Sequence, residues 1–160
     1  MSRAAALLAT ALALPARASA AAPSAASSLA SLREDYATAL RWGRYWIAVD
    51  DADRLDAVPG LPPTERAGLL VDGARARFLI GDAAGAERDL RRALALEPGG
   101  AEASYRLAAL LRDRPDEALP YAERAARAAA AAPRRAAAER LAGEIRLDLG
   151  DEAGARSSLR

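Results

Sequence analysis

The chain has 160 residues, a formal net charge of +1 and an apolar content of 52%, much of it alanine. Because it contains neither cysteine nor histidine, disulfides, thiol nucleophiles, cysteine–histidine zinc sites and histidine acid–base catalysis are excluded. A net charge near zero creates no overall electrostatic attraction to nucleic acid or to a membrane. Abundant alanine and few aromatic residues favour closely packed helices in a single domain.

Residues 1–20 have the pattern of a secretory signal peptide. Arg3 supplies a positive start, residues 4–14 form an apolar stretch too short to span a bilayer, and small residues precede a cleavage point after Ala20. An alanine-rich cytosolic leader or a mitochondrial presequence is the alternative. The pattern predicts a periplasmic or secreted chain, with a flexible linker over residues 21–28 and no stable membrane insertion after cleavage.

Residues 29–63 are expected to form an aromatic-rich helix, from Leu29 to Val49, and a loop into the next unit. An aromatic stripe on this helix either packs in the core, as a cap under the first repeat, or forms a surface for a partner. The residues of this possible aromatic surface are Trp42, Tyr45 and Trp46. The segment is alternatively a degenerate repeat, with Gly43 where two helices cross.

Four aspartates lie between Asp50 and Asp56. A calcium loop would require an oxygen ligand at Leu55 and a closing glutamate at Pro62, so the spacing disfavours one. Carboxylates at the start of a helix are the favoured interpretation. We therefore expect no metal site and no cofactor.

A central unit from Gly81 to Pro98 has the pattern of a helix with its entry turn and its end. Gly81 suits the left-handed residue that ends one helix, and Asp82 can accept the free N–H groups that begin the next. An apolar face at helical spacing follows, opposite charged residues. Upstream, residues 64–80 form a partner helix that is apolar on two faces, which predicts packing on both sides.

This unit resembles a tetratricopeptide repeat (TPR), a helix–turn–helix unit of about 34 residues. Gly81 and Asp82 stand at the family's inter-helix turn. Ala86 stands at the small residue where the two helices cross, and Leu90 at a large apolar position. The first helix departs from the family because Arg77 replaces its usual tyrosine. The resemblance implies an all-α fold in which antiparallel helical hairpins stack as a short right-handed solenoid.

Three repeats are expected within residues 64–160. Their expected bounds are 64–100, 101–133 and 134–160. In the middle repeat, Pro120 should delay or kink the second helix, and Pro133 should end it. Gly150 and Asp151 then repeat the turn of the central unit. The pattern stops inside a helix, as in a fragment of a longer chain or a frayed end.

The resemblance also implies a function, since members of the family bind peptides or proteins in a concave groove lined by the first helix of each repeat. The matching positions here are Arg75, Phe78, Glu102, Tyr105, Arg112, Arg140 and Glu144. The arginines either pair with acidic groups of a partner or are solvated surface charges. We therefore predict an exported scaffold for a protein or peptide, without catalysis.

Other classes of function are less well supported by the residues. An enzyme would need a catalytic site, and the sequence contains no glycine-rich phosphate loop. The carboxylate pair Asp50 and Asp53 could act in acid–base catalysis, but it lies in a predicted helix-capping segment. The N-terminal structural segment of a larger envelope assembly or export protein is the alternative to a scaffold. Nucleic-acid binding is disfavoured because arginines and carboxylates interleave along the chain.

Overall fold

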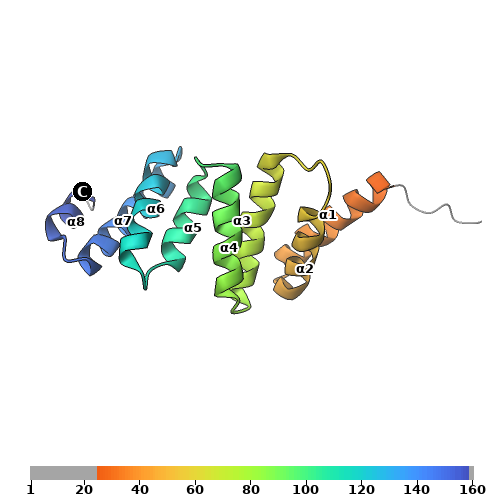
Figure 1. The fold of residues 1–160 in the computed structure, drawn as a ribbon, viewed down its shortest axis with the longest axis horizontal. Helices are drawn as coiled ribbons and strands as arrows, with labels where there is room; N and C mark the ends of the chain where they lie inside the picture. The colour runs from red at the N-terminus through yellow and green to blue at the C-terminus, as the bar shows by residue number, and fades with distance from the viewer. Residues whose placement is uncertain (1–24, 159–160) are drawn as a thin grey trace, which may run out of the picture.

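The structure, a computed structural model, describes residues 25–158, which form a row of antiparallel helical hairpins (Figure 1). The helices of this part are α1 (Ala25–Arg41), α2 (Tyr45–Asp56), α3 (Pro63–Leu79), α4 (Ala83–Leu96), α5 (Ala101–Leu110), α6 (Pro115–Ala128), α7 (Ala132–Asp148) and α8 (Glu152–Ser158). Residues 25–158 contain no strand. The predicted all-α fold of stacked hairpins is confirmed, whereas the predicted signal peptide lies outside the described residues.

Consecutive helices pair as α1–α2, α3–α4, α5–α6 and α7–α8, and each hairpin stacks on the one before it. In Figure 1 the turns inside the hairpins lie along the lower edge of the molecule, and the connections between hairpins lie along the upper edge. This arrangement places the first helices of successive hairpins in one row and the second helices in another. None of the described helices combines the length and the apolarity needed to cross a bilayer.

Helix α3 separates two parts of the hydrophobic core. On one face Leu70 and Ala74 pack into a cluster that extends through α4, α5 and α6 to α7. On the other face Ala76 packs with residues of α1 and α2, and Gly73 lies close to Ala52, with 3.4 Å between the Ala52 Cβ and the place a Gly73 Cβ would take. The predicted packing of this helix on both sides is confirmed.

The turn of the central unit forms as its residues predict. Gly81 adopts a φ of +88°, which glycine reaches without strain, and the Asp82 carboxylate accepts a hydrogen bond of 2.8 Å from the backbone N–H of Gly85. The same geometry recurs before α8, where Gly150 has a φ of +79°. Local turn chemistry therefore fixes both of these hairpins.

The N-terminal segment differs from the prediction of one helix over residues 29–49. A turn at Gly43, with a φ of +68°, divides it into α1 and α2, so Gly43 makes a turn and not a helix crossing. Helix α1 begins at Ala25, inside the segment expected to be a flexible linker. The four aspartates from Asp50 to Asp56 lie from the middle of α2 to its end, not at the start of a helix.

The prolines of the third and fourth hairpins also act differently from the prediction. Helix α6 begins at Pro115 and contains Pro120, so the second helix of this hairpin is not delayed. Pro133 lies in the first turn of α7 and does not end α6. A proline is tolerated at that position because the first N–H groups of a helix have no partner within it.

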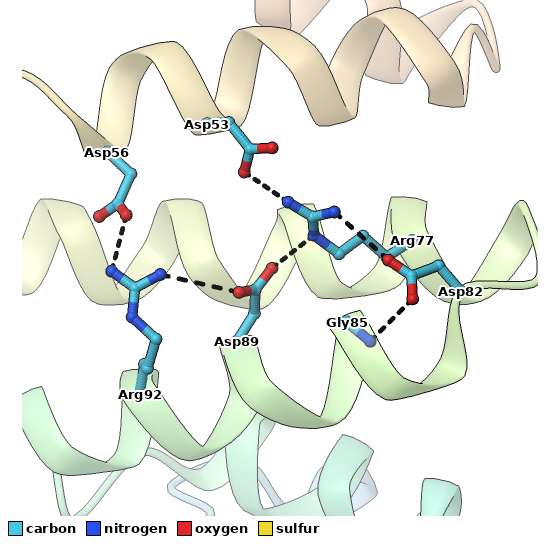
Figure 2. Close-up of polar contacts among 7 residues, drawn as sticks. All are labelled: Asp53, Asp56, Arg77, Asp82, Gly85, Asp89 and Arg92. Atoms are coloured by element: carbon cyan, nitrogen blue, oxygen red, sulfur yellow. Dashed lines mark hydrogen bonds and ion pairs between the residues drawn. The ribbon is translucent and has the colours of Figure 1, made fainter.

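Arg77, near the end of α3, joins the first two hairpins through carboxylates of both (Figure 2). Its Nε donates to Asp89 of α4 at 2.8 Å, and one terminal nitrogen donates to Asp53 of α2. The other terminal nitrogen lies 3.3 Å from Asp82. Burial lowers the pKa of Arg77, but hydrogen bonds to Asp53 and Asp89 outweigh it and raise the pKa, so this mostly buried guanidinium stays charged.

Arginines also form ion pairs between the second and third hairpins and between the third and fourth hairpins. Arg114, which precedes α6, contacts Glu87 of α4 at 2.6 Å. Arg146, near the end of α7, contacts Glu123 of α6 at 2.5 Å and also donates to Ser158 of α8. Each of the last three hairpins is thus tied to the second helix of the hairpin before it.

Candidate functional site

The first helices of adjacent hairpins line a groove, and its most apolar part lies between α3 and α5. A hollow of about 250 Å³ there has α3 and α5 as its walls and α4 as its base. Its lining includes Arg75, Phe78, Leu79, Leu90, Tyr105, Arg106 and Leu110. Three predicted groove residues, Arg75, Phe78 and Tyr105, therefore meet in one place. Phe78 is 58% exposed, so its ring is available to a ligand.

Two further hollows continue this groove. One, of about 400 Å³, lies where α3, the end of α4 and the start of α5 meet, and the other, of about 150 Å³, lies between α5, α6 and α7. Tyr105 lines both the apolar hollow and the one beside α7, and Glu102 and Arg134 line both of the further hollows. The shared residues show that the three hollows adjoin along α5, with the predicted groove residue Glu102 at the junction.

Charged groups on the groove wall largely compensate one another. Arg106 contacts Glu102 at 2.7 Å. Burial raises the pKa of Asp72 above its ordinary value and Glu102 adds to the rise, although Arg106 and Arg75 oppose it. Arg75 has no carboxylate within ion-pairing distance in the described part of the chain, which leaves it available for an anionic group of a ligand.

The remaining predicted groove residues, Arg112, Arg140 and Glu144, bind one another and their neighbours. Arg112 contacts Glu144 at 2.8 Å and Asp148 at 2.9 Å, which joins the end of α5 to α7. The hydrogen bond to Asp148 raises the pKa of Arg112, and the one to Glu144 adds to the rise. Arg140 contacts Glu144 at 3.1 Å. The guanidinium groups of Arg112 and Arg140 are therefore both bound to carboxylates of the chain itself.

The aromatic residues of the N-terminal hairpin lie apart from this groove. Trp42 is 70% exposed and Trp46 72%, so the interpretation of both as core or as a cap was wrong. Tyr45 is half-buried and packs at the edge of the smaller core cluster. The surface alternative is the one that fits the positions of the two tryptophans.

The acidic cluster of α2 is engaged by arginines. Asp51 contacts Arg54 at 2.8 Å. Asp56 contacts Arg92 of α4 at 2.7 Å (Figure 2). Within the described ranges, no group of three or more carboxylates is placed to hold a metal ion. Asp53 and Asp56 therefore serve the interface between the first two hairpins, whereas Asp51 pairs within α2.

Several groove residues were not singled out from the sequence. Asp72 lies one turn before Arg75 on the same helix face, and Arg106 directly follows Tyr105. Leu79 and Leu110 are the last residues of α3 and α5. Helical spacing from the predicted residues would have indicated Asp72, whereas the other three depend on how the hairpins stack.

Comparison with known proteins indicates the fold. No family model and no curated protein matches the sequence. Among solved structures, MamA superposes with a TM-score of 0.71 over 84% of this chain and 76% of its own, at 20% identity. The first TPR of Spaghetti (RPAP3), bound to an HSP90 peptide, superposes with a TM-score of 0.64 at 23% identity, over 78% of this chain and 97% of its own.

A putative kinesin light chain from Podospora anserina, with nearly identical TPR-like repeats, also superposes with a TM-score of 0.64, at 20% identity over 83% of this chain and 72% of its own. At these identities the likeness describes the path of the backbone and not the ligand. The helices, their pairing and these superpositions together show that the chain has the fold of a TPR-like solenoid.

Proposed function

We propose that this chain is a scaffold that binds a segment of another protein in the groove along α3, α5 and α7. The observation that carries the proposal is the apolar hollow that Phe78 of α3 and Tyr105 of α5 both line. A binding pocket of this kind combines apolar walls with a few polar groups. The likeness to the first TPR of RPAP3 supports a protein-interaction role, because that domain was solved with a bound HSP90 peptide.

The residues of the hollow indicate which ligand side chains it would accept. Leu79, Leu90 and Leu110 provide apolar surface for one aliphatic or aromatic side chain, whose burial contributes about 1.5–3 kcal/mol. Arg75 at the rim would pair with a carboxylate next to that side chain. We infer that the partner segment carries an apolar anchor with an acidic neighbour.

Selection from a displayed peptide library tests the proposal with the full chain. Selected peptides should share an apolar residue, and Phe78→Ala should weaken their binding about 5- to 100-fold. Leu96→Ala is the matched control, because Leu96 is a partly exposed apolar residue on α4 outside the hollow. Peptides that bind Phe78→Ala and Tyr105→Ala as tightly as the unchanged chain would refute the groove.

Export is the second part of the proposal, and it is supported by the sequence pattern of residues 1–20. The polypeptide recovered from an envelope or culture fraction should begin at Ala21. Mass spectrometry of the intact polypeptide measures this directly. A chain that keeps residues 1–20 and stays in the cytosol would contradict export but would leave the groove proposal standing.

A further inference from the structure

Both tryptophans of the chain lie at one place, the turn between α1 and α2, and both are largely exposed. Trp42 and Trp46 are 70% and 72% exposed, and the adjacent Ile47 is 50% exposed. Large apolar side chains gathered on a surface mark a site of interaction. We call the segment from Arg41 to Ile47 the aromatic tip.

The backbone of the tip turns these side chains outward. Helix α1 ends at Arg41 and α2 begins at Tyr45, and Gly43 with its φ of +68° closes the turn between them. The Tyr45 ring lies about 3.8 Å from the position a Cβ on Gly43 would take, so this aromatic side chain covers the turn. Trp42 and Trp46 are left on the outside of the hairpin.

The charges at the tip differ from those at the other turns. Arg77, Arg114 and Arg146 at those turns are all bound to carboxylates. Arg41 and Arg44 have no carboxylate within ion-pairing distance among the residues the structure describes. Two exposed tryptophans are thus flanked by two arginines that form no ion pair with a described residue.

Two carboxylates lie beside the tip, but neither forms an ion pair with Arg41 or Arg44. Arg44 and Ile47 line a shallow hollow with Asp35 and Asp51. Asp51 is buried and contacts Arg54 at 2.8 Å, which leaves Asp35 as the solvent-exposed carboxylate of that hollow. The tip itself, from Arg41 to Ile47, contains no acidic residue.

We propose that the aromatic tip docks on the surface of an anionic phospholipid bilayer. Tryptophan is favoured at the boundary between headgroups and acyl chains, because its ring is apolar and its N–H is polar. Arginine forms bidentate contacts with phosphate, and each basic residue near an anionic surface contributes about 1 kcal/mol. Docking is peripheral and requires no spanning helix. It is independent of the groove, which lies on other helices.

A bilayer fits the tip better than a second protein does. The hollow beside the tip is lined by Arg44 and Ile47 but by neither tryptophan, and both tryptophan side chains are largely exposed. Aromatic anchors of protein interfaces fill pockets on the partner, whereas a headgroup layer accepts projecting rings without a preformed cavity.

The tryptophans are themselves the probe, because the chain contains only these two. The full chain is mixed with vesicles of phosphatidylcholine containing about one-third phosphatidylglycerol, and with vesicles of phosphatidylcholine alone. With the anionic vesicles, the tryptophan emission should shift to shorter wavelength and brominated acyl chains should quench it. Unshifted, unquenched emission with both kinds of vesicle overturns the proposal.

Flotation of variants with the same vesicles locates the contact. Trp42→Ala with Trp46→Ala should lower partitioning about tenfold or more. Arg41→Ala and Arg44→Ala should each lower it about fivefold, and added salt should do the same. Phe78→Ala is the control, since Phe78 is similarly exposed but lies in the groove, and it should float like the unchanged chain.

Two results would overturn the proposal: lipid binding by another part of the chain, or contact of the tip with a second copy of the chain. If the double tryptophan variant floats as well as the unchanged chain, another part of the chain holds the lipid. If the emission shifts without lipid as protein concentration rises, and sedimentation shows dimers lost in the double variant, the tip contacts a second copy. Both tryptophans are exposed, so the double variant should keep the helical circular dichroism of the unchanged chain.

Discussion

Arg77 of α3 and Arg146 of α7 occupy the same place in two different hairpins and make equivalent contacts. Each reaches the second helix of the preceding hairpin, the aspartate that caps the following helix, and a polar residue further along that helix. The matching residues are Gly81, Asp82 and Gly85 in one hairpin and Gly150, Asp151 and Gly154 in the other. This recurring unit joins turn, cap and inter-hairpin contact, and the first predictions concern it.

Gly85→Ala should destabilise the chain. A Cβ on Gly85 would lie 2.0 Å from Asp82 Oδ2 and 2.9 Å from Arg77 Cδ, so the capping carboxylate must move away. Losing the cap costs about 1 kcal/mol. Gly68→Ala is the control, because no atom lies within 4 Å of its added Cβ, and it should stabilise α3 by about 0.5–1 kcal/mol. Thermal melts that rise for both variants would contradict this role of Gly85.

Arg77→Lys should lower the free energy of unfolding by about 1–3 kcal/mol, although it keeps the charge. The planar guanidinium group of Arg77 contacts three carboxylates at once, which the single ammonium group of lysine cannot do. The Arg77 side chain is only 15% exposed, so contacts that are lost would not be replaced by water. Arg91→Lys is the control, because the Arg91 side chain, which contacts Glu87, is 46% exposed. Weakening this ion pair should lower the free energy of unfolding by under about 1 kcal/mol. Equal shifts of the two urea midpoints would argue against a special role for Arg77.

Asp82 should make the folded state sensitive to acid. The hydrogen bond from the Gly85 N–H lowers the pKa of Asp82, and Arg77 adds to this. Because the folded pKa is depressed, the stabilisation is complete above the ordinary aspartate pKa of about 3.9 and is lost as pH falls through the folded value. Asp82→Asn keeps an oxygen for the cap but removes the charge.

The melting temperature of the unchanged chain should therefore exceed that of Asp82→Asn at pH 7, and the difference should shrink as pH falls below about 4. Melts recorded from pH 7 to pH 3 measure it. A difference that stays constant over this range would show that the charge of Asp82 does not contribute.

Ala86→Leu and Ala155→Leu should each destabilise the chain by about 1–3 kcal/mol. Both alanines are 1% exposed, at the crossings of α3 with α4 and of α7 with α8, so a leucine at either position would press against the paired helix. Ala84→Leu is the control, since Ala84 is exposed on α4. Unchanged melting of Ala86→Leu would show that the predicted repeat register is wrong.

The sequence predicts the parts of the fold that local patterns determine. Helical spacing of apolar residues shows that α3 packs on both faces, and Gly81 followed by Asp82 marks a turn whose φ and cap the structure confirms. The repeat register also brings Arg75, Phe78 and Tyr105 together, because equivalent positions on successive first helices face one groove.

Contacts between hairpins could not be predicted in this way. The pairing of Arg112 with Glu144 and Asp148 depends on the stacking of α5 against α7, which helical periodicity does not encode. The turn at Gly43 was missed for another reason. Arg44 occupies the capping position of α2 and makes no side-chain cap hydrogen bond, so the usual signal for the start of a helix is absent.

The arginine–carboxylate contacts between hairpins affect how the chain unfolds. In a repeat array, each unit is stabilised by itself and by its interface with the next one. Here many interface residues are alanines, which bury little area, and partly exposed ion pairs such as Arg114–Glu87 add to the connection. Dissolved ions screen such pairs. Higher ionic strength is therefore expected to weaken the coupling between hairpins, so that fewer of them unfold together.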